Sequence, residues 1–214
     1  MKRSFDILAA AAGLLLVSPV LLAAAIAVRI TSAGPIFFRQ ERIGRGGRPF
    51  FILKFRTMVQ NAAKLGGPIT IGNDARITPI GGVLRKTKLD ELPQLFNVLV
   101  GDMSLVGPRP EVPRYVEMFR EDYNVILQVR PGITDLASIK YRDEAAVLGK
   151  AADPEQEYVR VVLPEKIRLA KEYVARQSLR LDLSILFGTL MRLACDRLPR
   201  LRAATESKRV CDGR

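Results

Sequence analysis

Two adjacent carboxylates, Asp90 and Glu91, are the residues of this sequence best placed to do chemistry. They follow a basic run at 85–88 and precede an apolar helical pattern that ends at Gly101. Pro93 is tolerated only in a first helical turn, so we predict a helix that begins near Asp90 or Glu91. Both carboxylates would then lie at the positive end of the helix dipole, which favours their ionised form. The apolar positions of this helix are Leu92, Leu95, Phe96 and Leu99.

Two interpretations of these carboxylates are open. An ionised carboxylate beside cationic side chains can act as a nucleophile on an anionic phosphorus. However, Asp is among the commonest helix N-caps, and a run of Arg and Lys is usually a solvated face, so the local pattern alone favours capping. Residues 107–110, Gly-Pro-Arg-Pro, support the catalytic interpretation. The two prolines make a rigid loop around Arg109, and a rigidly held guanidinium suits phosphate recognition.

The runs at 89–99 and 101–110 resemble the bacterial sugar transferase family, the monotopic phosphoglycosyl transferases. The resemblance extends from Lys2 to about Arg192. It implies that a phosphosugar moves from a UDP-sugar to polyprenol (undecaprenyl) phosphate, with release of UMP. This reaction would begin the synthesis of a lipid-linked glycan, such as an exopolysaccharide or lipopolysaccharide.

The resemblance also implies roles for individual residues. Asp90 would be the nucleophile that forms a covalent aspartyl phosphosugar, and Glu91 would bind Mg²⁺ or manage protons, with both carboxylates as candidate metal ligands. Mg²⁺ and cationic side chains are needed because the carboxylate, the diphosphate and the lipid phosphate are all anionic. The sequence departs from the family pattern at 135–142, so only Arg142 is carried over from that loop. The expected substrate-binding residues are Arg85, Arg109, Lys54, Arg56 and Arg142.

Composition limits the alternatives. The 214 residues suit one domain, and the absence of histidine excludes His-based acid–base chemistry and His metal ligands. The two cysteines are too few for a disulfide framework or a zinc site. The net charge of +12 calls for an anionic partner, and with no tryptophan and no nucleic-acid motif, nucleic acid is the weakest choice. A membrane-anchored basic scaffold without enzymatic activity is the main alternative to an enzyme.

The N-terminal segment has an uncharged apolar run from Ile7 to Val28, of about the twenty residues that span a bilayer. A signal peptide, a transmembrane anchor and a re-entrant hairpin all fit this run. Ser18 and Pro19 divide it into halves, and proline removes a backbone donor and kinks a helix. Basic residues flank both ends, which favours two cytoplasmic ends and a hairpin in one leaflet. The family resemblance also implies a helix broken at this pair, on the cytoplasmic face of the bacterial inner membrane.

The remaining pattern predicts a mainly helical α+β fold with a small β element and interfacial amphipathic helices. Strands are expected within 34–49 and at 50–58, joined by a basic, glycine-rich turn, and a polar helix is expected at 111–122. A late helix has one apolar face that fits either core packing or a membrane interface: Leu183, Leu186, Phe187, Leu190 and Ala194.

The predicted divisions of the chain are a re-entrant membrane helix at 1–30, a catalytic domain at 31–195 and a basic disordered tail at 196–214. The expected partners are a UDP-sugar, polyprenol phosphate and the lipid of one leaflet. A homodimer is a further expectation, and nucleic acid is not expected.

Overall fold

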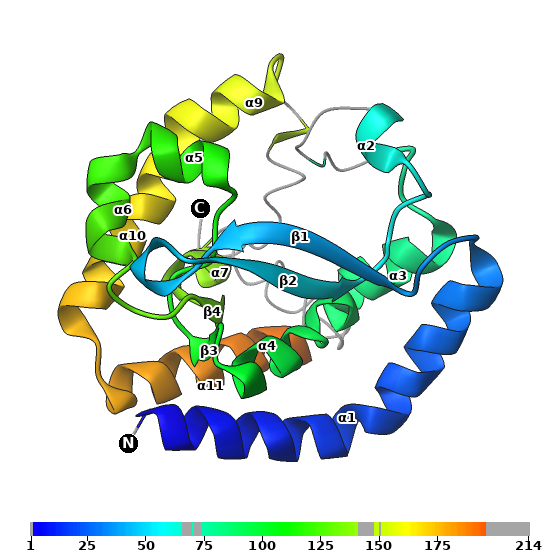
Figure 1. Ribbon diagram of the computed structural model, residues 1–214, viewed down its shortest axis with the longest axis horizontal. Coiled ribbons are helices and arrows are strands. Elements are labelled where there is room, and N and C mark those ends of the chain that lie inside the picture. Colours follow the sequence, from blue (N-terminus) through cyan, green and yellow to red (C-terminus); the bar gives the residue numbers. More distant parts are fainter. Residues whose placement is uncertain (1, 66–69, 71–73, 141–147, 150, 196–214) are drawn as a thin grey trace, which may run out of the picture.

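The computed structural model describes residues 2–65, 70, 74–140, 148–149 and 151–195 (Figure 1). This part of the chain is mainly helical, with two small two-stranded sheets, as predicted. The elements are α1 (Lys2–Thr31), β1 (Phe37–Ile43), η1 (Arg45–Gly47), β2 (Pro49–Phe55), α2 (Ala62–Leu65), α3 (Pro79–Thr87), η2 (Leu89–Glu91), α4 (Gln94–Val100), β3 (Ser104–Val106), α5 (Pro113–Met118), α6 (Arg120–Ile126), β4 (Gly132–Thr134), α7 (Leu136–Lys140), α9 (Pro154–Glu157), η3 (Tyr158–Val162), α10 (Leu163–Arg176) and α11 (Leu179–Cys195).

The β1–β2 hairpin crosses the middle of the molecule in Figure 1. The strands pair antiparallel, and the basic turn between them contains Gly46 and Gly47 at positive φ, a conformation that glycine adopts without strain. Side chains alternate along a strand, so Phe50, Ile52 and Lys54 lie on the same face of β2. Phe50 and Ile52 are buried in the core, which directs Lys54 inward as well.

The segment from α3 to α4 carries the carboxylate pair. Thr78 caps α3 by accepting a hydrogen bond from the Gly81 N–H at 3.0 Å. Gly81 lies so close to the backbone of Thr57 that a Cβ would meet the Thr57 carbonyl oxygen at 2.1 Å. A 3₁₀ turn, η2, follows α3, and α4 ends at Gly101 in the left-handed region, the C-terminal stop expected from the sequence.

Helix α1 is one long apolar helix that bends midway along its length (Figure 1). Pro19 lies inside it and cannot donate to the carbonyl of Leu15, four residues earlier. The Ser18 hydroxyl donates to this carbonyl at 2.9 Å, so the bend leaves Leu15 with a hydrogen bond. Among the described residues, α1 is the only helix long and apolar enough to cross a membrane, judged by length and composition.

Both ends of α1 are attached to the rest of the molecule. Near the N-terminus, the buried Asp6 carboxylate accepts hydrogen bonds from the Ser104 hydroxyl at 2.8 Å and the Leu105 N–H at 3.2 Å. Near the C-terminal end, Val28 packs with Phe55 and Leu84 in a core cluster. The outer face of α1 between these points is apolar and exposed, with Leu16 at 81% exposure.

The apolar stripe predicted for α11 is divided, because Leu186 packs against a core cluster while other members are exposed. Asp182 and Ile185 are buried, and Thr189 hydrogen bonds Thr134 of β4, so these positions form the inner face. Phe187, by contrast, is 66% exposed, and Leu183 and Leu190 are also exposed. Core packing, one of the two interpretations of this stripe, therefore does not hold for these three side chains.

The polar helix predicted at 111–122 is two helices, α5 and α6, that meet at Phe119. Phe119 has φ −119° and ψ 40°, outside the helical region, because the chain turns there to pack both helices onto the second core. This core contains buried side chains of α5, α6, η3 and α10, including Tyr115, Tyr123 and Ile167. The predicted tail at 196–214 lies outside the described residues.

Candidate active site

The carboxylate pair lies on a helical segment with a polar inner face. The buried positions are Asp90, Pro93, Gln94, Asn97 and Val98. Their spacing of i, i+3, i+4, i+7 and i+8 is that of one helix face. The predicted apolar positions lie elsewhere on the helix; Leu95 and Leu99 pack against the α1 side of the core, and Phe96 is 47% exposed. The segment that carries the carboxylate pair is thus polar toward the interior and apolar toward α1 and the surroundings.

Asn97 holds this face against β2. Its side-chain amide donates to the Phe51 carbonyl at 2.8 Å, and its oxygen accepts from the Leu53 N–H at 3.0 Å. Lys54 is the residue after Leu53 in β2. The hydrogen bond to Leu53 therefore brings the inward-facing Lys54 close to the inner face of the helix. The hydrogen bonds of one amide therefore set the position of Lys54 relative to the carboxylates.

Glu91 is held by two cations. Lys54 Nζ donates to Glu91 Oε1 at 2.7 Å. Arg109 binds the same carboxylate with both terminal nitrogens, Nη2 to Oε1 and Nη1 to Oε2, the latter at 3.3 Å. Burial raises the pKa of Glu91, but the charges and hydrogen bonds of Arg109 and Lys54 outweigh this and hold the pKa well below its usual value. Glu91 is therefore ionised at neutral pH.

Asp90 is in the opposite situation. It is only 8% exposed, and within the described part of the chain its Oδ1 atom is buried without a hydrogen-bond donor. Burial, followed by the negative charge of Glu91, raises the pKa of Asp90 above its usual value, against the opposing charges of Lys54, Arg85 and Lys88. Loss of water at Asp90 thus acts against the ionised form, which the helix dipole is predicted to favour.

Arg85 approaches Asp90 from α3. Its Nε donates to the Thr57 hydroxyl at 2.8 Å, which fixes the plane of the guanidinium. Burial lowers the pKa of Arg85, and the negative charge of Asp90 is the largest effect that opposes this lowering. The structure therefore brings together five residues predicted from the sequence. Asp90 and Glu91 lie at the centre, Arg85 and Lys54 lie beside them, and Arg109 is bound to Glu91.

Two further predicted residues are not part of this arrangement. The Arg56 guanidinium donates to the carbonyls of Ser32 and Ala33 at 2.8 and 2.6 Å and to the Ser32 hydroxyl at 2.7 Å. These contacts attach the chain after α1 to the end of β2, so Arg56 has a structural position here and its role in substrate binding stays a prediction. Arg142 lies outside the described residues.

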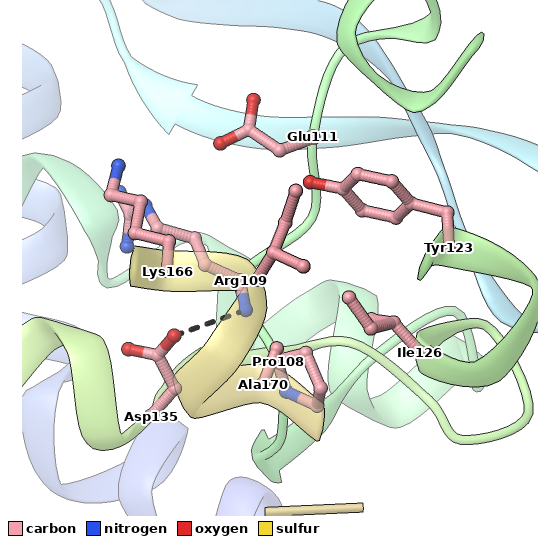
Figure 2. A pocket seen from close by; sticks show the side chains of 9 residues that line it. Pro108, Arg109, Glu111, Tyr123, Ile126, Asp135, Lys166 and Ala170 are labelled. Atoms are coloured by element: carbon pink, nitrogen blue, oxygen red, sulfur yellow. Dashed lines mark hydrogen bonds between the residues drawn. The ribbon is translucent and has the colours of Figure 1, made fainter. Parts of the chain in front are cut away.

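A small pocket lies on the other side of Arg109, between the 107–110 loop, α6 and α10 (Figure 2). Its polar lining includes Glu111, Asp135, Lys166 and the hydroxyl end of Tyr123. Asp135 Oδ2 accepts the Arg109 N–H at 3.3 Å, the dashed line in Figure 2, and so helps to hold the loop in place. Arg109 thus connects the carboxylate pair with this pocket.

Several residues that support the site were not identified from the sequence. Thr57 orients Arg85, Asp135 holds the Arg109 backbone, and Asn97 holds β2. Of the polar residues near the site, Gln94 and Asn97 could have been found from the sequence, because they lie at i+4 and i+7 from Asp90 on the predicted helix.

The described residues contain no cluster of three or more carboxylate, His or Cys side chains that could hold a metal ion. Mg²⁺ needs fewer protein ligands than that, because it is commonly held by one or two carboxylates together with substrate phosphates. Among the residues that the structure describes, Glu91 Oε2 has one contact, with Arg109 Nη1 at 3.3 Å, and a carboxylate oxygen can accept more than one bond. The pair fits a site of this kind and does not form an all-protein cage.

Comparisons with known proteins agree with the resemblance seen in the sequence. A family model described as "Bacterial sugar transferase" matches residues 1–196. The UDP-N-acetylgalactosamine-undecaprenyl-phosphate N-acetylgalactosaminephosphotransferase of Aeromonas hydrophila is 42% identical over 193 residues, which are 89% of this chain and 43% of that protein. The UDP-glucose:undecaprenyl-phosphate glucose-1-phosphate transferase of Escherichia coli (strain K12) is 40% identical over 197 residues, 90% of this chain and 40% of that protein.

A third relative is matched over most of its length. The exopolysaccharide production protein ExoY of Rhizobium meliloti (strain 1021) is 36% identical over 211 residues, 92% of this chain and 86% of ExoY. The chain spans less than half the length of the first two relatives.

Proposed function

The chain belongs to the bacterial sugar transferase family, and from this premise we propose that it transfers a phosphosugar from a UDP-sugar to undecaprenyl phosphate and releases UMP. The names of the Aeromonas and Escherichia relatives describe this type of transfer. The observation that carries the proposal is the arrangement around Asp90, a buried carboxylate beside a second carboxylate that Lys54 and Arg109 hold ionised.

The proposed reaction has two steps on Asp90. A carboxylate oxygen of Asp90 attacks the phosphorus that carries the sugar. A bond forms between them, the bond from that phosphorus to the bridging oxygen breaks, and UMP leaves with the electron pair. A phosphate oxygen of undecaprenyl phosphate then attacks the same phosphorus and displaces the Asp90 carboxylate. Because Oδ1 is buried in the inner face, Oδ2 is the oxygen that would attack.

The cations around the pair would reduce the repulsion between anionic groups. Arg85, beside Asp90, is placed to contact the phosphoryl oxygens during transfer. Lys54 and Arg109 already bind Glu91, so they would bind phosphate oxygens while they keep that carboxylate in place. Glu91 would hold Mg²⁺ through Oε2 together with diphosphate oxygens of the substrate. When bound, Mg²⁺ would neutralise charge that develops on the transferred group.

We place the enzyme at the cytoplasmic face of the bacterial inner membrane, with α1 re-entering one leaflet. Asp6 and Val28, near the two ends of α1, are both attached to the same folded body, which supports N- and C-terminal ends of α1 on one side of the membrane. The exposed apolar residues of α11, such as Phe187 and Leu190, would lie in the interface beside it. Undecaprenyl phosphate carries its headgroup at this depth.

A direct test uses purified protein, Mg²⁺, undecaprenyl phosphate and a panel of UDP-sugars, with UMP as the measured product. We expect one UDP-sugar to release UMP in proportion to the lipid-linked product. With this sugar and no lipid acceptor, up to one equivalent of UMP should appear, and the protein mass should rise by one phosphosugar on the peptide that contains Asp90. Absence of UMP with every UDP-sugar would contradict the proposal, and the basic scaffold would then be the better account.

A further inference from the structure

Gln94 is a buried polar residue that no step above uses. It is 1% exposed, and in the described part of the chain its amide nitrogen Nε2 is buried without an acceptor. Buried polar groups in folded proteins nearly always have a partner, so an unpaired amide donor next to a reactive residue calls for an explanation.

The unpaired donor lies on the same helix face as an unpaired acceptor. Asp90 and Gln94 are four residues apart in the inner stripe of buried positions, and Asp90 Oδ1 also has no partner among the residues that the structure describes. Residues four apart on a helix are neighbours, and a glutamine side chain is long enough to reach a carboxylate at this spacing. The charges around Asp90 come from Glu91, Lys88, Arg85 and Lys54, and none of these donates a hydrogen bond to Oδ1.

Asn97, the third polar residue of the stripe, is an example of an amide with a structural role. Asn97 lies one turn after Gln94, and both its oxygen and its nitrogen are bonded to the backbone of β2. Among the described residues, Gln94 Nε2 has no comparable hydrogen bond, so the Gln94 amide nitrogen does not hold β2 as the Asn97 amide does.

We propose that Gln94 is a positioning residue for the transfer, and that its side-chain amide donates to Oδ1 of Asp90 when substrate is bound. This bond would fix the carboxylate plane so that Oδ2 points at the phosphorus. The bond would satisfy two buried groups at once. The inference rests on the proposed function, because it assigns Gln94 a part in the same reaction.

The test replaces the amide without changing its volume. Gln94→Met keeps an unbranched side chain and removes the donor, and Gln94→Glu keeps the shape but presents only acceptors to Asp90. In steady-state assays of UMP release by the full chain in detergent or nanodiscs, we expect kcat to fall about 10²-fold in both variants. The KM for the UDP-sugar should stay within about twofold, because binding of the diphosphate by cations is untouched.

Thermal unfolding separates positioning from packing. Removal of an unpaired buried amide should leave the Tm of Gln94→Met unchanged or higher, whereas Asn97→Leu, the matched control on the same face, should unfold at a lower temperature. Full kcat in Gln94→Met would overturn the proposal, as would a loss of folding in both Gln94 variants. If the parent protein itself released no UMP from any UDP-sugar, the proposed function would fail, and this inference with it.

Discussion

At the scale of single residues, the site depends on two neighbouring carboxylates whose surroundings differ. Glu91 is paired with Lys54 and Arg109, so its charge is stabilised and it is held in place. Asp90 is buried, and within the described part of the chain one of its oxygens has no hydrogen-bond donor, so its charge is poorly stabilised. A poorly solvated carboxylate is a better nucleophile than a fully hydrogen-bonded one, which is why we assign the attack to Asp90 and the supporting role to Glu91.

The first prediction concerns Asp90→Asn. Asn is nearly isosteric and tolerated at helix N-termini, so the fold and membrane association should be retained. Turnover should be lost by several orders of magnitude, because the amide cannot form the covalent intermediate. UMP release by freshly purified protein measures this, since deamidation would restore the parent residue. An Asn variant with full activity would favour the capping interpretation of Asp90.

The second prediction concerns pH. The raised pKa of Asp90 means that its ionised fraction, and with it the rate of attack, increases with pH through a value above the usual 3.8. The pKa of Glu91 is shifted in the opposite direction, below its usual value. This shift contributes folding stability that is present above about pH 4.5 and is lost as the pH falls through the lowered pKa. Single-turnover UMP release without lipid acceptor, from pH 4 to 8, should therefore lose activity at a higher pH than the fold is lost. Coincident losses of activity and fold would contradict this order.

At the scale of elements, α1 shows how one proline and one serine shape a long apolar helix. The bend follows from Pro19, and the freed Leu15 carbonyl is bonded by Ser18, so the break costs no unsatisfied carbonyl in an apolar environment. A straight helix of this length would span a bilayer, whereas a bent one can return to the side from which it entered.

The third prediction therefore replaces Ser18 and Pro19 with Leu. A continuous apolar helix should form, and the N-terminus should move, in part of the population, to the opposite side of the membrane. The basic residues at both ends and the attachment of Asp6 resist a complete inversion. Labelling of a cysteine placed near residue 2 with a membrane-impermeant reagent, in intact cells, measures the shift. If the native N-terminus is labelled from outside, α1 is an ordinary transmembrane anchor.

At the scale of the whole molecule, the first and last described helices are joined. Lys2 Nζ donates to Asp182 Oδ2 of α11 at 2.5 Å, to the Val106 carbonyl at 3.0 Å and to the Tyr173 hydroxyl at 3.2 Å. Tyr173 in turn donates to Asp182 Oδ1 at 2.6 Å. This cluster holds the start of α1 and the inner face of α11 in one body, as the proposed placement of both helices at one membrane surface requires. The expected homodimer stays a prediction.

The fourth prediction is that Asp182→Asn destabilises the protein by about 2–3 kcal/mol, because it leaves Lys2 without its counter-ion beside a buried cluster. Glu172→Gln, which breaks exposed pairs with Arg168 and Arg176 on α10, is the control and should change stability by less than about 1 kcal/mol. Thermal unfolding in nanodiscs measures both variants. Equal effects would show that the cluster contributes no more than a surface ion pair.

Local features of this protein could be predicted from its sequence because they depend on neighbouring residues. The long apolar N-terminal helix, the glycine turn of the hairpin, the stop at Gly101 and the rigid loop around Arg109 all follow from propensity and backbone chemistry. The family resemblance then related Asp90 and Glu91 to a reaction, which no local pattern could do.

Only the tertiary structure decided which side chains contact one another and which are buried away from water. Lys54 and Arg56 are two residues apart, yet one binds Glu91 and the other holds the chain after α1, because β2 ends between them. The apolar positions of α4 and α11 divide between two environments: Leu95, Leu99 and Leu186 pack against the core, whereas Phe96, Phe187 and Leu190 are exposed. The pKa of Asp90 rises because it is buried in the folded protein, and the pKa of Glu91 falls because Arg109 and Lys54 come from distant segments to pair with it. Desolvation and ion pairing depend on three-dimensional distance, which short-range sequence patterns do not contain.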